Sequence, residues 1–232
     1  MAKSFPTQFR TGQFSMTDFA ARRTMMVDNQ IRPADVTKFP IIEAMLAVPR
    51  EAFVPADKRD AAYLGENIDL GQGRVLLDPR TLAKMLDALD IHADELVLDI
   101  GTGTGYSAAV AARLAEAVIA LEEDEALISD GNAALTSEGA DNVVLHEGPL
   151  SEGAATHGPY DVIMIQGAVE HLPEGVTDQL KEGGRIAVLF AEGHLGVVRI
   201  GYRIDGRINW RFAFNAGAPV LPGFERHQAF TL

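Results

Sequence analysis

The chain of 232 residues contains no cysteine, which excludes disulfide bonds, thiolate metal sites and cysteine nucleophiles. No window approaches the roughly 20 consecutive apolar residues that a membrane-spanning helix needs. The N-terminal segment up to Phe19 carries basic residues but lacks the continuous apolar stretch of a signal peptide. We therefore expect a cytoplasmic protein that does not bind membranes.

Basic residues are also scarce, with 20 Lys and Arg against 33 Asp and Glu, for a net charge of −13. A protein that neutralises phosphate groups needs a basic patch or stripe. The densest basic groupings, Arg22-Arg23 and Lys58-Arg59, are too short to form one. The charge balance therefore argues against nucleic acid as a partner.

No Ser-His-Asp set and no catalytic pair of carboxylates stands out in the sequence. His157 and His171 lie in loop-like segments without a second ligand at metal-binding spacing, so we expect surface residues and no metal site. Glu170, beside His171, is only a weak candidate for a site residue. The sequence carries no indication of an oligomeric state.

Length and composition are those of one globular domain, with 47% hydrophobic and 23% charged residues. Residues 1–15 have no periodicity and are predicted to be a leader, either an extension or the result of a mis-assigned start before Met16. Residues 16–94 are predicted to form a helical region with a loop on the substrate side. Residues 95–232 are predicted to form the α/β core.

In the helical region, apolar spacing predicts helices, one of which ends at Pro49. Asp78 and Pro79 are typical of an N-cap followed by the first helical position. The predicted elements are helices at 18–31, 38–48 and 57–63, an extended loop at 65–77 and a helix at 78–89.

From residue 95 onward, short runs rich in Val, Ile and Leu alternate with helical segments, which predicts a buried parallel sheet with helical crossovers. Gly183-Gly184 is predicted to be a tight connection between a helix and a strand. Asp205-Gly206 indicates a type I′ turn that closes an antiparallel hairpin. The predicted strands are 95–100, 117–121, 143–146, 160–166, 185–190, 195–204 and 207–214, and the predicted helices are 106–115, 124–138 and 172–181.

The first strand of this core ends in an Asp-x-Gly-x-Gly-x-Gly sequence from Asp99 to Gly105. A dinucleotide-binding loop needs its third glycine three positions after the second, where this chain has Tyr106. The pattern instead resembles motif I of the class I methyltransferases that use S-adenosyl-L-methionine (SAM). The expected cofactor is therefore SAM, with S-adenosylhomocysteine (SAH) as product, bound by Asp99, Gly101, Thr102, Gly103 and Gly105. The alternative is a plain tight turn between strand and helix.

Acidic residues end the second predicted strand, where a carboxylate can accept hydrogen bonds from both ribose hydroxyls. This makes Glu122, and to a lesser degree Glu123, a candidate cofactor ligand. The alternative is a solvated helix start. Gly148 and the backbone near Leu150 follow the third strand, where the adenine is expected. Gln166 ends the fourth strand, either as a site residue or as a polar strand terminus.

Beyond this motif, the N-terminal half resembles the protein-L-isoaspartate O-methyltransferases. The string Val-Pro-Arg-Glu-Ala-Phe-Val-Pro at 48–55 is the most specific part of the resemblance. The resemblance covers about residues 24–190 and implies a class I methyltransferase sandwich with a mostly parallel sheet. It also implies transfer of a methyl group to the α-carboxylate of an isoaspartyl residue in damaged protein. Further matching segments are 26–32, 61–63, 71–73, 142–143, 159–161 and 179–185.

Two positions depart from the family pattern. Leu77 replaces a serine that the family places beside the substrate carboxylate, in a loop that here reads Val-Leu-Leu-Asp-Pro at 75–79. Pro149 follows Gly148 where the family has an acid near the adenine. Loss of a hydrogen bond to a charged group costs roughly 1.5–3 kcal/mol, which would slow the isoaspartyl reaction about tenfold to hundredfold. Asp78 would add a negative charge near the acceptor unless it caps the next helix.

These departures leave two alternatives open. One is a SAM-binding protein that senses or regulates without transferring methyl groups. The other is a methyltransferase with a more apolar acceptor, bound beside the side chains of residues 75–77.

Overall fold

The computed structural model describes residues 18–192 and 195–226, so the predicted leader at 1–15 lies outside the described residues. The main sheet has seven strands in the order β5-β4-β3-β6-β7-β8-β9. Strands β3 to β7 run parallel to one another, whereas β8 is antiparallel to both β7 and β9. The strands are β3 (Leu96–Ile100), β4 (Ala117–Glu122), β5 (Val143–Glu147), β6 (Tyr160–Val169), β7 (Leu180–Glu192), β8 (Leu195–Ile204) and β9 (Arg207–Ala216).

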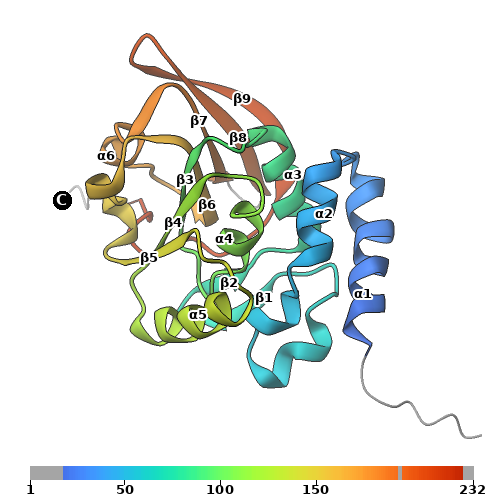
Figure 1. The fold of residues 1–232 in the computed structure, drawn as a ribbon. Helices are drawn as coiled ribbons and strands as arrows, with labels where there is room; N and C mark the ends of the chain where they lie inside the picture. Colours follow the sequence, from blue (N-terminus) through green and yellow to red (C-terminus); the bar gives the residue numbers. More distant parts are fainter. Residues whose placement is uncertain (1–17, 193–194, 227–232) are drawn as a thin grey trace, which may run out of the picture.

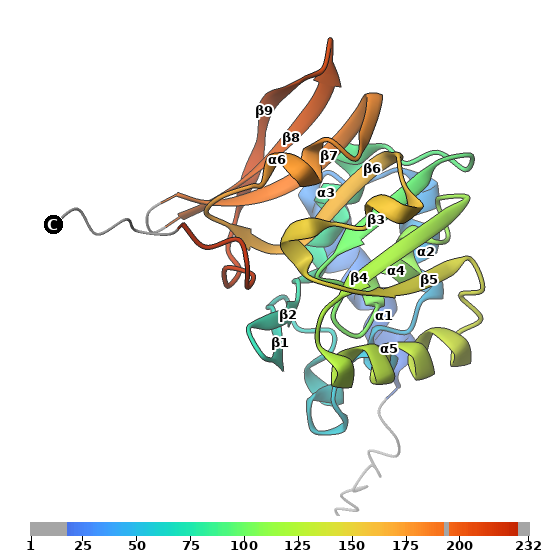
Figure 2. The same cartoon turned by 90° about the vertical axis from the view of Figure 1, so that its left-hand side faces the viewer.

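Alternating side chains of the central strands enter two cores, one on each face of the sheet, because successive residues of a strand point to opposite faces. Val97 and Val162 belong to the core that contains the helices of the N-terminal half, while Leu98 and Ile163 belong to the core on the opposite face. Both ends of the sheet and the helices beside it are visible in Figures 1 and 2. The helices are α1 (Phe19–Met26), α2 (Phe39–Ala47), α3 (Pro79–Leu89), α4 (Tyr106–Ala111), α5 (Glu125–Ser137) and α6 (Glu174–Thr177).

The predicted α/β sandwich is confirmed, together with the helical extension and the closing hairpin. Asp205 and Gly206 have φ of 53° and 72°, as the predicted type I′ turn requires. Asp78 caps α3 by accepting a hydrogen bond from the backbone N–H of Thr81 at 3.0 Å. Figure 1 shows α1 and α2 side by side at one edge of the molecule. Within the described residues, no helix is both long and apolar enough to cross a membrane.

Several predicted boundaries are wrong. The helix expected at 172–181 is the single turn α6, because Leu180 already pairs with Tyr160 in the sheet. Gly183-Gly184 consequently lies inside β7 and not before it. The helix expected at 106–115 ends at Ala111, and the one expected at 18–31 changes from α-helix to π-helix at Val27. The short helices are η1 (Val27–Ile31), η2 (Arg32–Ala34), η3 (Arg50–Phe53), η4 (Ala56–Ala61), η5 (Leu150–Glu152) and η6 (Ala155–His157).

The loop expected at 65–77 also contains regular structure. It forms a small antiparallel hairpin of β1 (Ile68–Gly71) and β2 (Arg74–Leu76), separate from the main sheet (Figure 2). Strands of four and three residues give almost no period-2 signal, so the sequence pattern did not reveal the hairpin.

Candidate functional site

The glycine loop between β3 and α4 is held against the neighbouring strand. The backbone N–H groups of Gly101 and Thr102 both donate to the carbonyl of Leu121, at 2.9 and 3.2 Å. Gly101, Gly103 and Gly105 have φ of 72°, 58° and 90°, in the region that side chains other than glycine rarely adopt. The backbone of this turn therefore favours glycine at positions 101, 103 and 105.

Asp99 stabilises the glycine loop through hydrogen bonds to its carboxylate. Its carboxylate is fully buried and accepts hydrogen bonds from Thr102 Oγ1 at 2.8 Å, Ser107 Oγ at 2.6 Å and Gln166 Nε2 at 2.7 Å. Burial raises the pKa of Asp99 to about 6, against these hydrogen bonds and with a further contribution from the negative charge of Glu122. The predicted residues Asp99 and Thr102 thus bond to each other, and Gln166 holds Asp99 in place. Ser107, which completes this set, was not predicted.

Glu122 ends β4 with its carboxylate turned toward the glycine loop. Its Oε2 accepts from the backbone N–H of Gly103 at 3.0 Å. Its Oε1 accepts from the N–H groups of Glu123 and Asp124 at 2.9 and 3.2 Å. The side chain is fully buried. A carboxylate at this edge can accept a pair of hydroxyl groups, which is the property for which Glu122 was predicted.

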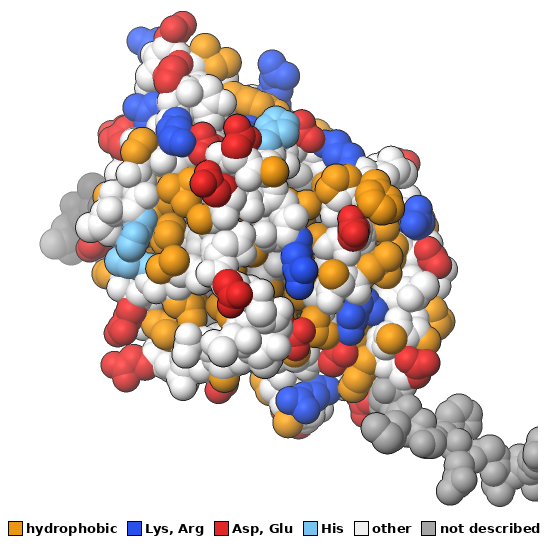
Figure 3. Space-filling model, viewed as in Figure 1, with side chains coloured by type: hydrophobic (Ala, Val, Ile, Leu, Met, Phe, Trp, Pro, Cys, Tyr) orange, Lys and Arg blue, Asp and Glu red, His pale blue; other side chains and the backbone are white. Residues whose placement is uncertain are grey.

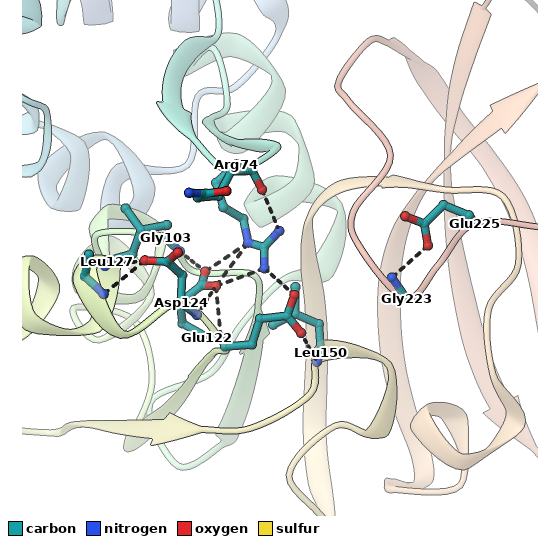
Figure 4. Close-up of polar contacts among 11 residues, drawn as sticks. Arg74, Gly103, Glu122, Asp124, Leu127, Leu150, Gly223 and Glu225 are labelled. Atoms are coloured by element: carbon teal, nitrogen blue, oxygen red, sulfur yellow. Dashed lines mark hydrogen bonds and ion pairs between the residues drawn. The ribbon is translucent and has the colours of Figure 1, made fainter.

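Arg74, from β2, fills the position in front of Glu122 (Figure 4). Its Nε donates to both carboxylate oxygens of Glu122 at 3.1 and 3.2 Å, and its Nη2 lies 3.0 Å from Glu122 Oε1. Nη2 also donates to Glu123 Oε1 at 3.0 Å. Sequence reasoning missed Arg74. The available signal was a charged residue directly before the apolar run at 75–77, which needs an acidic partner if that run is buried.

The four consecutive acids at 122–125 divide their roles. Glu122 and Glu123 bind Arg74, whereas Asp124 caps α5 through the N–H groups of Ala126 and Leu127, each at 3.0 Å. The predicted alternative of a helix start therefore applies to Asp124, while Glu122 and Glu123 remain predicted cofactor ligands.

The segment after β5 lies beside the same site. Gly148 N–H donates to the carbonyl of Glu122 at 3.1 Å, and Leu150 N–H donates to Glu123 Oε2 at 3.4 Å. Leu150 is fully buried, whereas Pro149 is exposed. The structure thus brings Gly148 next to Glu122 and Glu123.

The weak candidate Glu170 and the two histidines expected at the surface lie apart from this set. His157 is exposed and its Nε2 lies 3.2 Å from Nδ1 of His146. His171 and Glu170 both donate their backbone N–H to the carbonyl of Phe224. Among the described residues, no group of three or more His, Asp or Glu side chains is arranged to hold a metal ion. On the face drawn in Figure 3, Lys and Arg are scattered among acidic and apolar side chains.

The loop that departs from the family pattern is buried. Val75, Leu76 and Leu77 all pack in the core that contains the N-terminal helices. The carbonyl of Leu77 accepts a hydrogen bond from Nη2 of Arg50 at 2.7 Å. Asp78, expected to add a negative charge near the acceptor unless it caps a helix, is the N-cap of α3.

The strand order, the glycine loop and the carboxylate at the end of β4 define a class I methyltransferase fold. The model of the protein-L-isoaspartate(D-aspartate) O-methyltransferase (PCMT) family matches residues 21–209. The chain belongs to this family of SAM-dependent O-methyltransferases.

Individual relatives agree with this assignment. Protein-L-isoaspartate O-methyltransferase 1 of Rhodopseudomonas palustris (strain HaA2) is 40% identical over 172 residues, which cover 74% of this chain and 70% of the relative. The enzyme of the same name from Roseiflexus castenholzii (strain DSM 13941 / HLO8) is 34% identical over 171 residues, 74% of this chain and 78% of the relative.

Solved structures show the same fold. A protein-L-isoaspartate O-methyltransferase superposes with a TM-score of 0.77 at 24% identity, covering 87% of this chain and 66% of that chain. A Plasmodium falciparum protein of this type, in complex with S-adenosyl-L-homocysteine, has a TM-score of 0.74 at 17% identity, covering 89% of this chain and 99% of that chain.

Proposed function

We propose that this chain transfers the methyl group of SAM to a carboxylate of a protein or peptide, with the α-carboxylate of an isoaspartyl residue as the first acceptor to test. The single observation that carries the proposal is the buried carboxylate of Glu122, 3.0 Å from the N–H of Gly103 in the glycine loop. We further propose the cytoplasm as the location, in line with the expectation from the sequence.

The residues around Glu122 suit the ribose of SAM. The guanidinium of Arg74 presents two N–H donors to the Glu122 carboxylate, and in this respect it stands in for the two ribose hydroxyls. Glu123 and Gly148 flank this position, and Leu150 N–H lies beside it. The proposed cofactor residues are Asp99, Gly101, Thr102, Gly103, Gly105, Glu122, Glu123 and Gly148.

Methyl transfer from SAM to a carboxylate requires few catalytic side chains. SAM supplies a methyl group already activated by its positively charged sulfur. A carboxylate acceptor, with a pKa near ~4, is ionised at neutral pH and needs no general base. The protein contributes alignment of the acceptor oxygen with the methyl group and exclusion of water. The absence of an evident acid–base pair from the sequence is therefore compatible with this reaction.

The acceptor is tested by methylation of an isoaspartyl peptide with radiolabelled SAM, using the wild type, Leu77→Ser and Leu77→Ala. Leu77 is only 3% exposed, so either replacement leaves a cavity and costs stability. Because the two variants are nearly equal in volume, their difference isolates the hydroxyl. We expect Leu77→Ser to methylate the isoaspartyl peptide roughly tenfold to hundredfold faster than Leu77→Ala. Equal rates would show that position 77 does not bind the carboxylate.

Leu77 also supports a second candidate, a family member with a different acceptor or one that binds SAM without transferring its methyl group. Titration calorimetry with SAM separates these possibilities. Binding without turnover of any carboxylate peptide would favour the sensor, and no binding would refute both candidates. Isoaspartyl turnover by the wild type at the level of a family member with the usual serine would refute a changed acceptor.

A further inference from the structure

The hairpin β1–β2 inserts two side chains into the proposed cofactor site. Arg74 pairs with Glu122, and the two side chains are 2% and 0% exposed. Leu70, on the other strand, lies over the glycine loop so closely that a Cβ on Gly103 would be 2.7 Å from Leu70 Cδ1. One small element thus covers both the carboxylate and the glycine loop.

The pairing with Arg74 leaves Glu122 no capacity for another ligand. A carboxylate offers about four lone-pair sites. Three backbone N–H groups, from Gly103, Glu123 and Asp124, already donate to Glu122. The Nε and Nη2 groups of Arg74 add two more donors. The two ribose hydroxyls would take the positions that Nε and Nη2 of Arg74 occupy, so they can bind Glu122 only when Arg74 has left it.

The hairpin is built so that its tip can move while its base stays fixed. At the base, Asn67 accepts from the N–H of Asp78 at 2.8 Å and donates to the carbonyl of Gly217 at 2.7 Å. At the tip, Gly71, Gln72 and Gly73 all have positive φ, and nothing lies within 4 Å of a Cβ placed on Gly71. Outward displacement of the tip would separate Arg74 from Glu122 and Leu70 from the glycine loop, while the anchored base stays in place.

We propose that Arg74 is a gate on the cofactor site: it occupies the ribose position of Glu122, and it must swing out with the hairpin before SAM or SAH binds. The inference rests on the cofactor site of the proposed function. The measured affinity of the protein for the cofactor is therefore lower than that of the open site, because displacing Arg74 costs part of the binding free energy.

The test is titration calorimetry with SAH on the wild type, Arg74→Gln and Arg80→Gln. Arg80 is exposed on the first turn of α3, so its replacement removes the same charge six residues away without touching Glu122. We expect Arg74→Gln to bind SAH roughly tenfold to hundredfold more tightly than the wild type, on the reasoning that the competent fraction of the protein rises by that factor. Arg80→Gln should match the wild type.

The outcomes separate the gate from the cofactor assignment. If the wild type binds SAH and Arg74→Gln binds no more tightly, the gate is refuted and the proposed function stands. If no variant binds SAH, the cofactor assignment fails and the gate falls with it.

A second measurement uses the wild type in case Arg74→Gln does not fold. The Nε–H signal of Arg74, assigned in isotope-labelled wild type by through-bond correlation to its own backbone, should exchange slowly with water in the free protein. Addition of SAH should remove that protection. Slow exchange that persists in the SAH complex would show that Arg74 stays on Glu122, which would overturn the proposal.

Discussion

The pH dependence of folding should carry a component from Asp99 with an unusual sign. Burial raises the pKa of Asp99 from an ordinary value of 3.8 to about 6 in the folded protein. Between these values the folded state binds a proton that the unfolded chain has released, so stability falls as pH rises. The difference corresponds to roughly 3 kcal/mol, fully present as a penalty above pH 7 and absent below pH 4. Asp99→Asn cannot ionise and should lack this component.

The Asp99 component can be measured by urea unfolding from pH 4 to pH 7. It is the free energy of unfolding of the wild type minus that of Asp99→Asn. This difference should fall as pH rises. Asp161→Asn is the control, and its difference from the wild type should be nearly flat over this range, because a carboxyl with a lowered pKa loses its stabilising component only below its ordinary value of 3.8. Burial pushes the pKa of Asp161 upward, but hydrogen bonds from Leu96 N–H and Lys181 outweigh burial and leave the pKa below its ordinary value. A wild-type-minus-Asp99→Asn difference that is flat or rises with pH would refute the assignment of a raised pKa to Asp99.

Two further variants test the support of the glycine loop. Gln166→Leu removes the donor to Asp99 Oδ1 at 2.7 Å and should lower the urea-derived stability by roughly 1.5–3 kcal/mol, because a buried carboxylate loses a hydrogen bond; an unchanged midpoint would contradict this role. Gly105→Ala forces a side chain to φ of 90° and brings its Cβ to 3.1 Å from Leu135 Cδ1, so it should cost more than the roughly 1–3 kcal/mol of backbone strain alone. Gly139→Ala, at φ of 64° with nothing within 4 Å, measures that strain alone, and equal thermal shifts in the two variants would argue against the contact.

Those parts of the fold that depend on local chemistry were predictable from the sequence. The Asp78-Pro79 start of α3 and the Asp205-Gly206 turn each follow from the backbone preferences of two adjacent residues. The length of α6 was not predictable in this way. Leu180 lies in a sequence compatible with a helix, and it joins β7 because pairing with Tyr160 in the sheet outweighs local propensity.

In the site, too, features set by neighbouring residues were predictable and features set by long-range contacts were not. Gly101, Gly103 and Gly105 could be named because their spacing is fixed by one turn. Arg74 could not, because its partner Glu122 lies 48 residues away in sequence and the pair exists only once the hairpin meets the end of β4. Long-range contacts of this kind leave at most an indirect trace, here a charged residue beside a buried apolar run.

Residue 77 is anchored by hydrogen bonds to its backbone as well as by the packing of its buried side chain, and the backbone bonds remain when serine replaces leucine. Arg50, fully buried, donates to the carbonyls of Leu77 and Ala62 at 2.7 Å each, and its guanidinium lies 4.9 Å from the centre of the Tyr106 ring. None of these contacts involves the Leu77 side chain. The loop should therefore hold serine, alanine or leucine at the same place, so a gain in isoaspartyl turnover specific to Leu77→Ser would report the hydroxyl itself.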